Sequence, residues 1–158
     1  IIIKVNSLID KETIDALYKA SRAGVQVSLV VRGICGLVPG VKGFSENIRI
    51  SSILGRYLEH SRIYYFENKG EEPVILVGSA DWMPRNFFRR IEAIFPIENT
   101  AMQKRIKEIL DIYLKDNLFA KTLEPSGSYR TPRSLKKKPP FSAQGHLAEI
   151  ATSAKTKT

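Results

Sequence analysis

Short apolar runs and one amphipathic segment organise the beginning of the chain. Residues 1–6 and 25–31 are rich in β-branched side chains, and both runs are short enough for buried strands. Between them, the apolar residues of 10–23 recur on one helical face, with Asp10 placed to cap the first turn and Gly24 placed to follow the last. Strand, helix and strand in this order predict a βαβ unit with parallel pairing and a right-handed crossover.

The pattern continues with further strands and a second helix. Strands are predicted at 48–53, 62–66, 74–77 and 90–97, with a hairpin turn at 67–72, and a strongly amphipathic helix is predicted from about 102 to 117. The elements sum to an α/β fold, in which a mixed, largely parallel sheet is flanked by helices.

The net charge of +9 is unevenly distributed over the 158 residues. Residues 1–120 hold 17 Lys and Arg against 14 Asp and Glu, whereas 121–158 hold 8 against 2. The latter segment is rich in Pro, Ser and Lys, a composition that buries little apolar surface. We therefore expect a folded domain at 1–120 and a basic, mostly flexible tail at 121–158, in which 141–150 could form a weak helix.

Several classes of protein are excluded by composition. A single cysteine cannot form an internal disulfide, and no apolar run is long enough to span a membrane. The first residues lack the basic and apolar regions of a signal peptide and resemble a strand entered midway, so we expect a fragment of a longer protein. The positive charge favours anionic partners such as phosphates, nucleic acid or an acidic membrane surface.

One constellation of residues has the form of a phosphoryl-transfer site. His60, Arg62 and Glu67 are followed, after the hairpin, by Gly78-Ser79-Ala80-Asp81. An imidazole can attack phosphorus or protonate a leaving oxygen, a cation two residues along a strand can hold phosphate oxygens on the same side, and a carboxylate can orient the imidazole. The pattern resembles the phospholipase D motif, with Arg62, Glu67 and Asp81 replacing Lys, Asp and Asn. By itself it fits equally a surface histidine among ordinary charged neighbours.

Four segments in order carry a more specific resemblance. They are Lys4–Asp10, Arg32–Cys35, Leu58–Phe66 and Ser79–Asn86, and together they resemble the C-terminal phospholipase D-like domain of polyphosphate kinase. This resemblance implies an enzyme that transfers the terminal phosphate of ATP reversibly to inorganic polyphosphate through a phosphohistidine. It also implies that the phosphorylated histidine and the ligands of Mg²⁺ lie in a preceding domain, so that the isolated fragment is inactive.

The resemblance also assigns roles to residues of this chain. His60 matches a second histidine that acts as a general acid or supports the phosphohistidine, and Arg32 and Arg90 match arginines that contact nucleotide phosphates. Arg62 is a further phosphate-binding candidate, and Ser79 and Asp81 are supporting ones. Glu67 either orients His60 or simply begins the hairpin. No metal site is expected in the fragment.

The implied partners are ATP, ADP, polyphosphate and the preceding domains of the same enzyme. The whole protein is expected to be a cytoplasmic homo-oligomer, with peripheral attachment to the inner membrane left open and no nucleic acid expected. Two alternatives remain open from the sequence. One is a single-motif phosphodiesterase or nuclease that dimerises to pair two copies of His60; the other is a non-enzymatic polyanion-binding module using Arg32, Arg90 and the basic tail.

Overall fold

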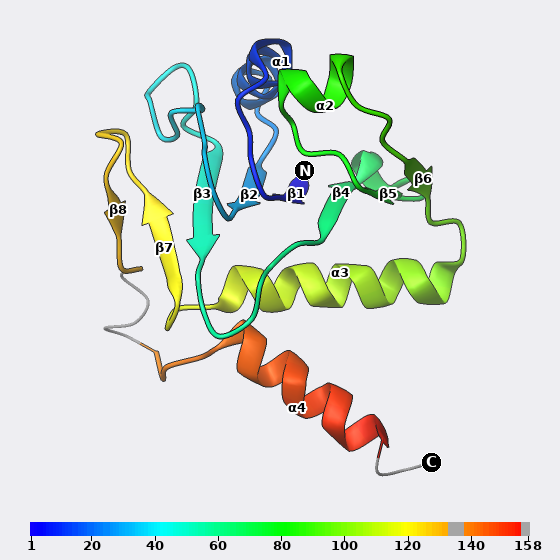
Figure 1. The fold of residues 1–158 in the computed structure, drawn as a ribbon. Coiled ribbons are helices and arrows are strands. Elements are labelled where there is room, and N and C mark those ends of the chain that lie inside the picture. Colours follow the sequence, from blue (N-terminus) through cyan, green and yellow to red (C-terminus); the bar gives the residue numbers. More distant parts are fainter. Residues whose placement is uncertain (133–137, 156–158) are drawn as a thin grey trace.

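One eight-stranded sheet with helices on both faces forms the domain in the computed structural model, which describes residues 1–132 and 138–155 (Figure 1). The strands are β1 (Ile2–Val5), β2 (Val27–Val31), β3 (Ile48–Ile53), β4 (Arg62–Phe66), β5 (Val74–Gly78), β6 (Ile94–Pro96), β7 (Ala120–Leu123) and β8 (Tyr129–Arg130). The helices are α1 (Lys11–Arg22), α2 (Pro84–Phe88), α3 (Thr100–Lys115) and α4 (Ala143–Lys155), with a 3₁₀ turn at Asn68–Gly70.

The spatial order of the strands is β6-β5-β4-β1-β2-β3-β7-β8. Strands β1, β2 and β3 pair in parallel, whereas β4 pairs antiparallel with β1, and the strands beyond this central group also pair antiparallel. The α/β class and the mixed sheet are confirmed, but the parallel part is smaller than expected. The reason is that short turns connect β4 to β5 and β7 to β8, and such connections require antiparallel partners.

Alternation along the strands sends apolar side chains to both faces of the sheet. Ile3, Leu29 and Ile50 pack with Leu17 of α1, while Ile63 of the opposite face packs with the α3 helix. Figure 1 shows α1 and α2 on one side of the sheet and α3 on the other, with α4 lying beyond α3. The core therefore has two layers, one on each side of the central strands.

Local signals place most elements where the sequence predicts them. The Asp10 carboxylate caps α1 by accepting from the Thr13 amide at 2.9 Å, and Gly24 follows the helix with φ of +85°. The predicted strand at 90–97 is wrong over its first half, because only Ile94–Pro96 pair with β5. Residues 90–93 belong to no helix or strand. They follow the short helix α2, which begins at Pro84, a residue suited to the first helical position, and ends at Phe88.

Parts of the segment at 121–158, which is expected to be a flexible tail, form regular structure among the described residues. Strand β7 crosses the expected domain boundary and pairs with β3, and β8 extends the sheet by one strand. Helix α4 packs Ala143, Leu147 and Ile150 against the Ile112 and Tyr113 side of α3, which supplies the apolar surface that the segment's composition lacks. The weak helix predicted at 141–150 is thus present and longer. None of the helices in the described ranges combines the length and apolarity needed to cross a bilayer.

Candidate phosphate site at the sheet edge

Several of the predicted site residues meet at one edge of the central sheet. Parallel pairing of β1 with β2 aligns Val5 with Val31, so that Arg32 follows directly at the carboxyl end of β2. The antiparallel strand β4 begins at the same edge, where Arg62 pairs with Gly78. Ser79 directly follows Gly78 in sequence, and His60 lies two residues before Arg62. Side chains distant in sequence are therefore gathered where strand ends leave backbone groups free to meet a ligand.

An ion pair fixes Arg62 in this edge. Its Nη2 lies 2.8 Å from Oδ2 of Asp81, and the two side chains are only 12% and 8% exposed. The other carboxylate oxygen of Asp81 accepts from the backbone amides of Asn6 at 2.6 Å and Ser7 at 3.2 Å. Burial alone raises the pKa of Asp81, but the bonds from Arg62, Asn6 and Ser7 together outweigh it and hold the pKa below its ordinary value.

The same guanidinium reaches His60. Nη1 of Arg62 lies 3.2 Å from Nδ1 of His60 and donates to the His60 carbonyl oxygen at 2.9 Å. Since a guanidinium can only donate, Nδ1 must accept, and the proton of a neutral imidazole is then carried on Nε2. His60 is exposed, so this Nε2–H group is open to a ligand. The arrangement supplies a hydrogen-bond donor next to a fixed positive charge.

Arg32 is held at the neighbouring strand end. Its Nε donates to Oδ1 of Asn6 at 3.0 Å, and its carbonyl oxygen accepts from the Ser52 hydroxyl at 2.9 Å. Among the described residues, the buried Nδ2 of Asn6 has no hydrogen-bond partner. Asn6 therefore links the two arginines, since its side chain contacts Arg32 and its backbone amide contacts the carboxylate that holds Arg62.

Glu92 organises the remaining candidates and was not predicted from the sequence. Its carboxylate accepts from the Ser79 hydroxyl and from Nδ2 of Asn86 at 2.6 Å, and it forms an ion pair with Arg90, whose Nε lies 3.2 Å away. The bond from Ser79 is the main reason that the pKa of Glu92 is lowered. Arg90 is exposed and is joined to the site through this carboxylate. Glu92 lies outside the spacing of the motif. The pairing of Gly78 with Ile94 and the hydrogen bond from the Ser79 amide to the Ala93 carbonyl at 2.9 Å bring it near. Glycine at position 78 permits this approach, because a Cβ there would collide with the Ala93 carbonyl oxygen.

Of the predicted supporting residues Glu67, Ser79 and Asp81, Glu67 is the one that the fold places away from His60. It follows the last residue of β4, whereas His60 lies two residues before the first, so Ser61 and the five residues of the strand, at about 3.3 Å each, separate them. Glu67 instead begins the 3₁₀ turn at Asn68–Gly70. Of the two readings left open for Glu67, the structure supports the start of the hairpin.

A buried charged group lies directly beneath His60. Lys4 is 1% exposed, and its Nζ lies 3.4 Å from the Glu59 carboxylate and donates to the Ser61 carbonyl at 3.2 Å. The Tyr113 ring lies under the same ammonium, 5.1 Å from its centroid. Burial lowers the pKa of Lys4, and the Glu59 carboxylate opposes part of that shift. Glu59 also accepts from Nε2 of Gln144 at 2.9 Å. Sequence reasoning missed this group because a lysine within an apolar strand gives no local sign of its partner.

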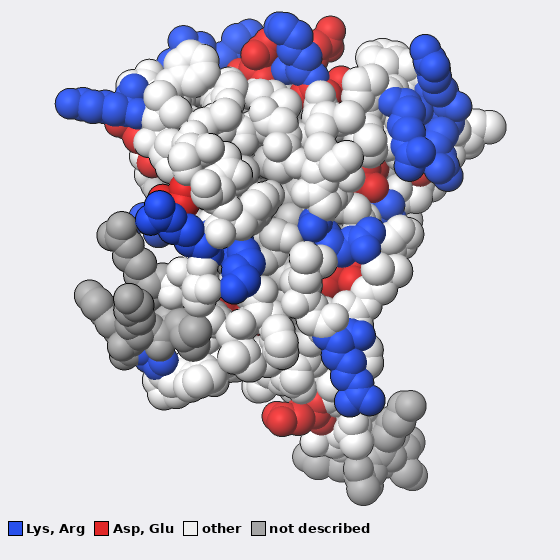
Figure 2. All heavy atoms as spheres, turned by 60° about the vertical axis from the view of Figure 1, so that its left-hand side comes forward, with Lys and Arg blue, Asp and Glu red and all other residues white. Residues whose placement is uncertain are grey.

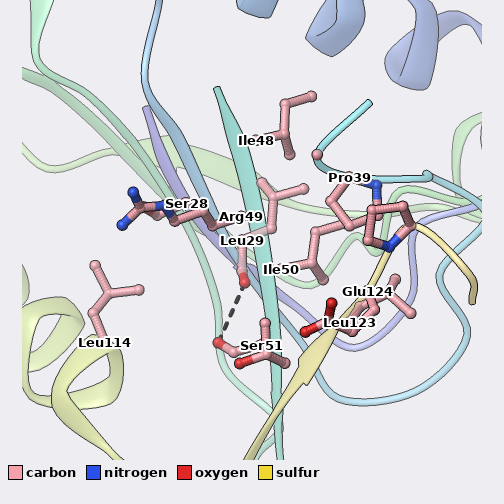
Figure 3. A pocket seen from close by; sticks show the side chains of 13 residues that line it. Ser28, Leu29, Pro39, Ile48, Arg49, Ile50, Ser51, Leu114, Leu123 and Glu124 are labelled. Carbon is pink, nitrogen blue, oxygen red and sulfur yellow. Dashed lines mark hydrogen bonds between the residues drawn. The ribbon is translucent and has the colours of Figure 1, made fainter. Parts of the chain in front are cut away.

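Two hollows flank the sheet, and only one of them contains a predicted site residue. A hollow of about 540 Å³ beside His60 is lined by the 57–61 loop, Tyr113 and the first turns of α4. The other, of about 400 Å³, lies over β2, β3 and β7 (Figure 3). There Arg49 and Ser51 stand among apolar side chains, with the Ser51 hydroxyl donating to the Leu29 carbonyl at 3.5 Å. Figure 2 shows Lys and Arg side chains in several separate groups across this side of the molecule, with fewer acidic ones between them.

Comparison of the sequence with known proteins shows which family the chain belongs to. The family described as "Polyphosphate kinase C-terminal domain 2" matches residues 1–144. A polyphosphate kinase of Synechocystis is 55% identical over 136 residues, which is 85% of this chain and 18% of that protein. One of Pseudomonas putida is 50% identical over 149 residues, which is 94% of this chain and 20% of that protein.

A solved structure agrees with the sequence comparison. The crystal structure of polyphosphate kinase from Porphyromonas gingivalis superposes with a TM-score of 0.89 at 38% identity, over 99% of this chain and 24% of that one. The chain thus spans about a fifth to a quarter of the length of these relatives. With the fold, the sequence and the ordered motifs in agreement, the chain belongs to the polyphosphate kinase family and corresponds to its C-terminal domain.

Proposed function

We propose that this chain forms one wall of the active site of a polyphosphate kinase, which transfers the terminal phosphate of ATP reversibly to inorganic polyphosphate. The observation that carries the proposal is the edge cluster of Arg32, His60 and Arg62 in a chain of this family. Guanidinium groups suit a polyphosphate substrate because their planar N–H pairs match phosphate oxygens. A histidine in a preceding domain would receive the phosphoryl group and become a phosphohistidine while ADP leaves, as in the family that the sequence resembles.

The proposed role of this wall is to bind and polarise phosphate. Arg32 and Arg62 neutralise charge on phosphate oxygens, and Asp81 and Asn6 hold them in place so that little reorganisation accompanies the reaction. The Nε2–H of His60 donates a hydrogen bond to the oxygen that leaves phosphorus, which stabilises the negative charge that develops on this oxygen as the P–O bond breaks. Arg90, exposed and joined to Glu92, is a further contact for the nucleotide phosphates.

Mg²⁺ is expected as a cofactor of the whole enzyme. Within the part of the chain that the structure describes, no group of three or more His, Cys, Asp or Glu side chains could hold a metal ion. The phosphate contacts proposed for this chain come from guanidinium and imidazole groups. A bound Mg²⁺ would neutralise further charge on the phosphates, with ligands from elsewhere in the polypeptide.

The two histidines of the chain make a matched test. In a full-length polyphosphate kinase carrying this domain, His60→Gln should slow polyphosphate synthesis by about 10²–10³-fold, the usual cost of losing one preorganised hydrogen-bond donor. His146→Gln, on α4, should leave the rate close to that of the parent enzyme. Folding should be unaffected in His60→Gln because the side chain is exposed. Full activity in His60→Gln would overturn the proposed role of this edge.

A further inference from the structure

The side chain of Gln144 is inserted beneath the loop that carries His60. Its Nε2 donates to the Tyr57 carbonyl at 2.7 Å and to the Glu59 carboxylate at 2.9 Å, and its Oε1 accepts from the Tyr57 amide at 2.9 Å. Gln144 is 5% exposed although it lies in the first turn of α4. Both ends of one amide group are therefore occupied by the residues that lead into His60.

The opposite side of the loop is fixed by Lys4. Its ammonium contacts the Glu59 carboxylate and the Ser61 carbonyl, which are the side chain before His60 and the backbone after it. Glu59 is 8% exposed and shares its carboxylate between Lys4 and Gln144. His60 itself is exposed and is thus the projecting residue of a loop whose two neighbours are held from below.

The C-terminal segment that delivers Gln144 is attached to the end of α3 by polar contacts. The Asp116 carboxylate accepts from the Ala143 amide at 2.8 Å. The backbone amide of Asn117 donates to the Phe141 carbonyl at 3.2 Å, and its side-chain Oδ1 accepts from the Phe141 amide at 2.7 Å. Beyond Gln144, Leu147 and Ile150 pack on α3. The polar contacts of Phe141 and Ala143, next to Gln144 in sequence, fix the height and angle at which the first turn of α4 presents Gln144.

We infer that Gln144 is a positioning residue for the phosphoryl-transfer site, and that the C-terminal helix α4 sets the placement of His60 through it. The inference rests on the proposed role of His60 for its meaning in catalysis. The physical statement beneath it concerns only the loop. Without the amide of Gln144, the Tyr57 backbone and the Glu59 carboxylate lose their shared partner, and the remaining contacts of Lys4 and Arg62 hold the loop less firmly.

Nuclear magnetic resonance of the 158-residue chain tests the physical statement without any enzyme assay. With only two histidines, ¹³C-labelled imidazole groups give two Cε1–H signals, assigned by His60→Gln and His146→Gln. Gln144→Met retains the length of the side chain and removes its polar atoms. We expect the His60 signal to shift and broaden in this variant, because the ring samples several positions relative to Arg62. An unchanged His60 signal in folded Gln144→Met overturns the inference.

Two further variants separate positioning from a general loss of packing. Ile150→Ala loosens α4 on α3 without touching the 57–61 loop, so the His60 signal should remain that of the parent chain. Gly55→Ala disturbs the same contact from the other side, because a Cβ there would lie 2.5 Å from Oε1 of Gln144, and it should reproduce the change in Gln144→Met. A shifted His60 signal in Ile150→Ala, or an unchanged one in Gly55→Ala, would also contradict the inference.

Kinetics of a full-length polyphosphate kinase carrying this domain complete the test. Gln144→Met should lower kcat by roughly 10-fold to 100-fold, as expected for a small misplacement of a reacting group, with the KM for ATP changed by less than about 3-fold. A rise in KM at unchanged kcat would mean that Gln144 serves substrate binding and would refute the positioning role. If His60→Gln were fully active, the proposed function would fail, whereas the His60 signal in Gln144→Met would still decide whether Gln144 holds the loop.

Discussion

The ion pair between Arg62 and Asp81 offers the sharpest test of how this site is held. Asp81→Asn keeps Oδ1, which accepts from the Asn6 and Ser7 amides, and replaces Oδ2 by an NH₂ group facing Arg62 at the former 2.8 Å contact. The new NH₂ group and the Arg62 guanidinium are then both hydrogen-bond donors, so the contact between them is lost. Breaking a buried pair costs about 3–5 kcal/mol, and the 12% exposure of Arg62 lets water return to it, so we expect a loss of about 3 kcal/mol in the free energy of unfolding.

The pH dependence of that loss carries a sign that can be checked. Because the pKa of Asp81 is lowered in the folded chain, its stabilisation is present above the ordinary carboxyl pKa of 3.8 and disappears as the pH falls through the folded value. The difference in stability between the parent chain and Asp81→Asn should therefore be constant near neutral pH and shrink below about pH 4. Urea unfolding followed by far-ultraviolet circular dichroism at a series of pH values measures it.

A matched Asp-to-Asn control lies on α1. Asp15 accepts from Lys11 at 2.7 Å, the same kind of contact at a similar distance, but both side chains are largely exposed. Asp15→Asn should change stability far less than Asp81→Asn, since solvent screens an exposed pair. The reasoning is refuted if the two variants lose equal stability, or if the loss in Asp81→Asn stays constant down to acid pH.

Two further predictions concern the layers that carry the site. Tyr64→Phe removes the hydroxyl that donates to the Ala80 carbonyl and should lower the free energy of unfolding by about 1–3 kcal/mol. It should also remove a step near pH 12 from an ultraviolet titration of tyrosinate, because burial raises the pKa of this phenol to about 12. Leu110→Ala empties a fully buried position of α3 and should cost about 2–5 kcal/mol in urea unfolding, with the His60 signal of the folded chain unchanged. A smaller loss would mean that the side chains between the sheet and α3 can collapse around the cavity left by Leu110.

Elements fixed by neighbouring residues could be read from the sequence. The cap of α1 at Asp10 and the strand at Ile48–Ile53 depend on local chemistry and on side-chain alternation. The strand expected from Arg90 failed because its apolar residues belong partly to an exposed corner, where Ile91 is fully exposed. Periodicity indicates which residues could pair, whereas the edge of a neighbouring strand decides which of them do.

The candidate site could likewise be predicted from the sequence only in part. His60, Arg62 and Asp81 stand within a recognisable spacing, and alternation along β4 explains why the first two share an edge. The partners of Glu59 could not be found, because Lys4 and Gln144 lie 55 and 85 residues away in sequence and neither has a motif around it. Contacts of this kind follow from strand order and helix docking, and these are properties of the whole fold.

The central place of β1 has a consequence for how this domain is made. Its two hydrogen-bonding neighbours, β2 and β4, are both synthesised after it, and the second is complete only at Phe66. During synthesis, the apolar segment at Ile1–Val5 therefore stays unpaired until these strands emerge, and unpaired apolar strands are prone to aggregate. The buried ammonium of Lys4 interrupts that segment with a charge, so the residue that anchors the loop beneath His60 also acts as a gatekeeper for the nascent chain.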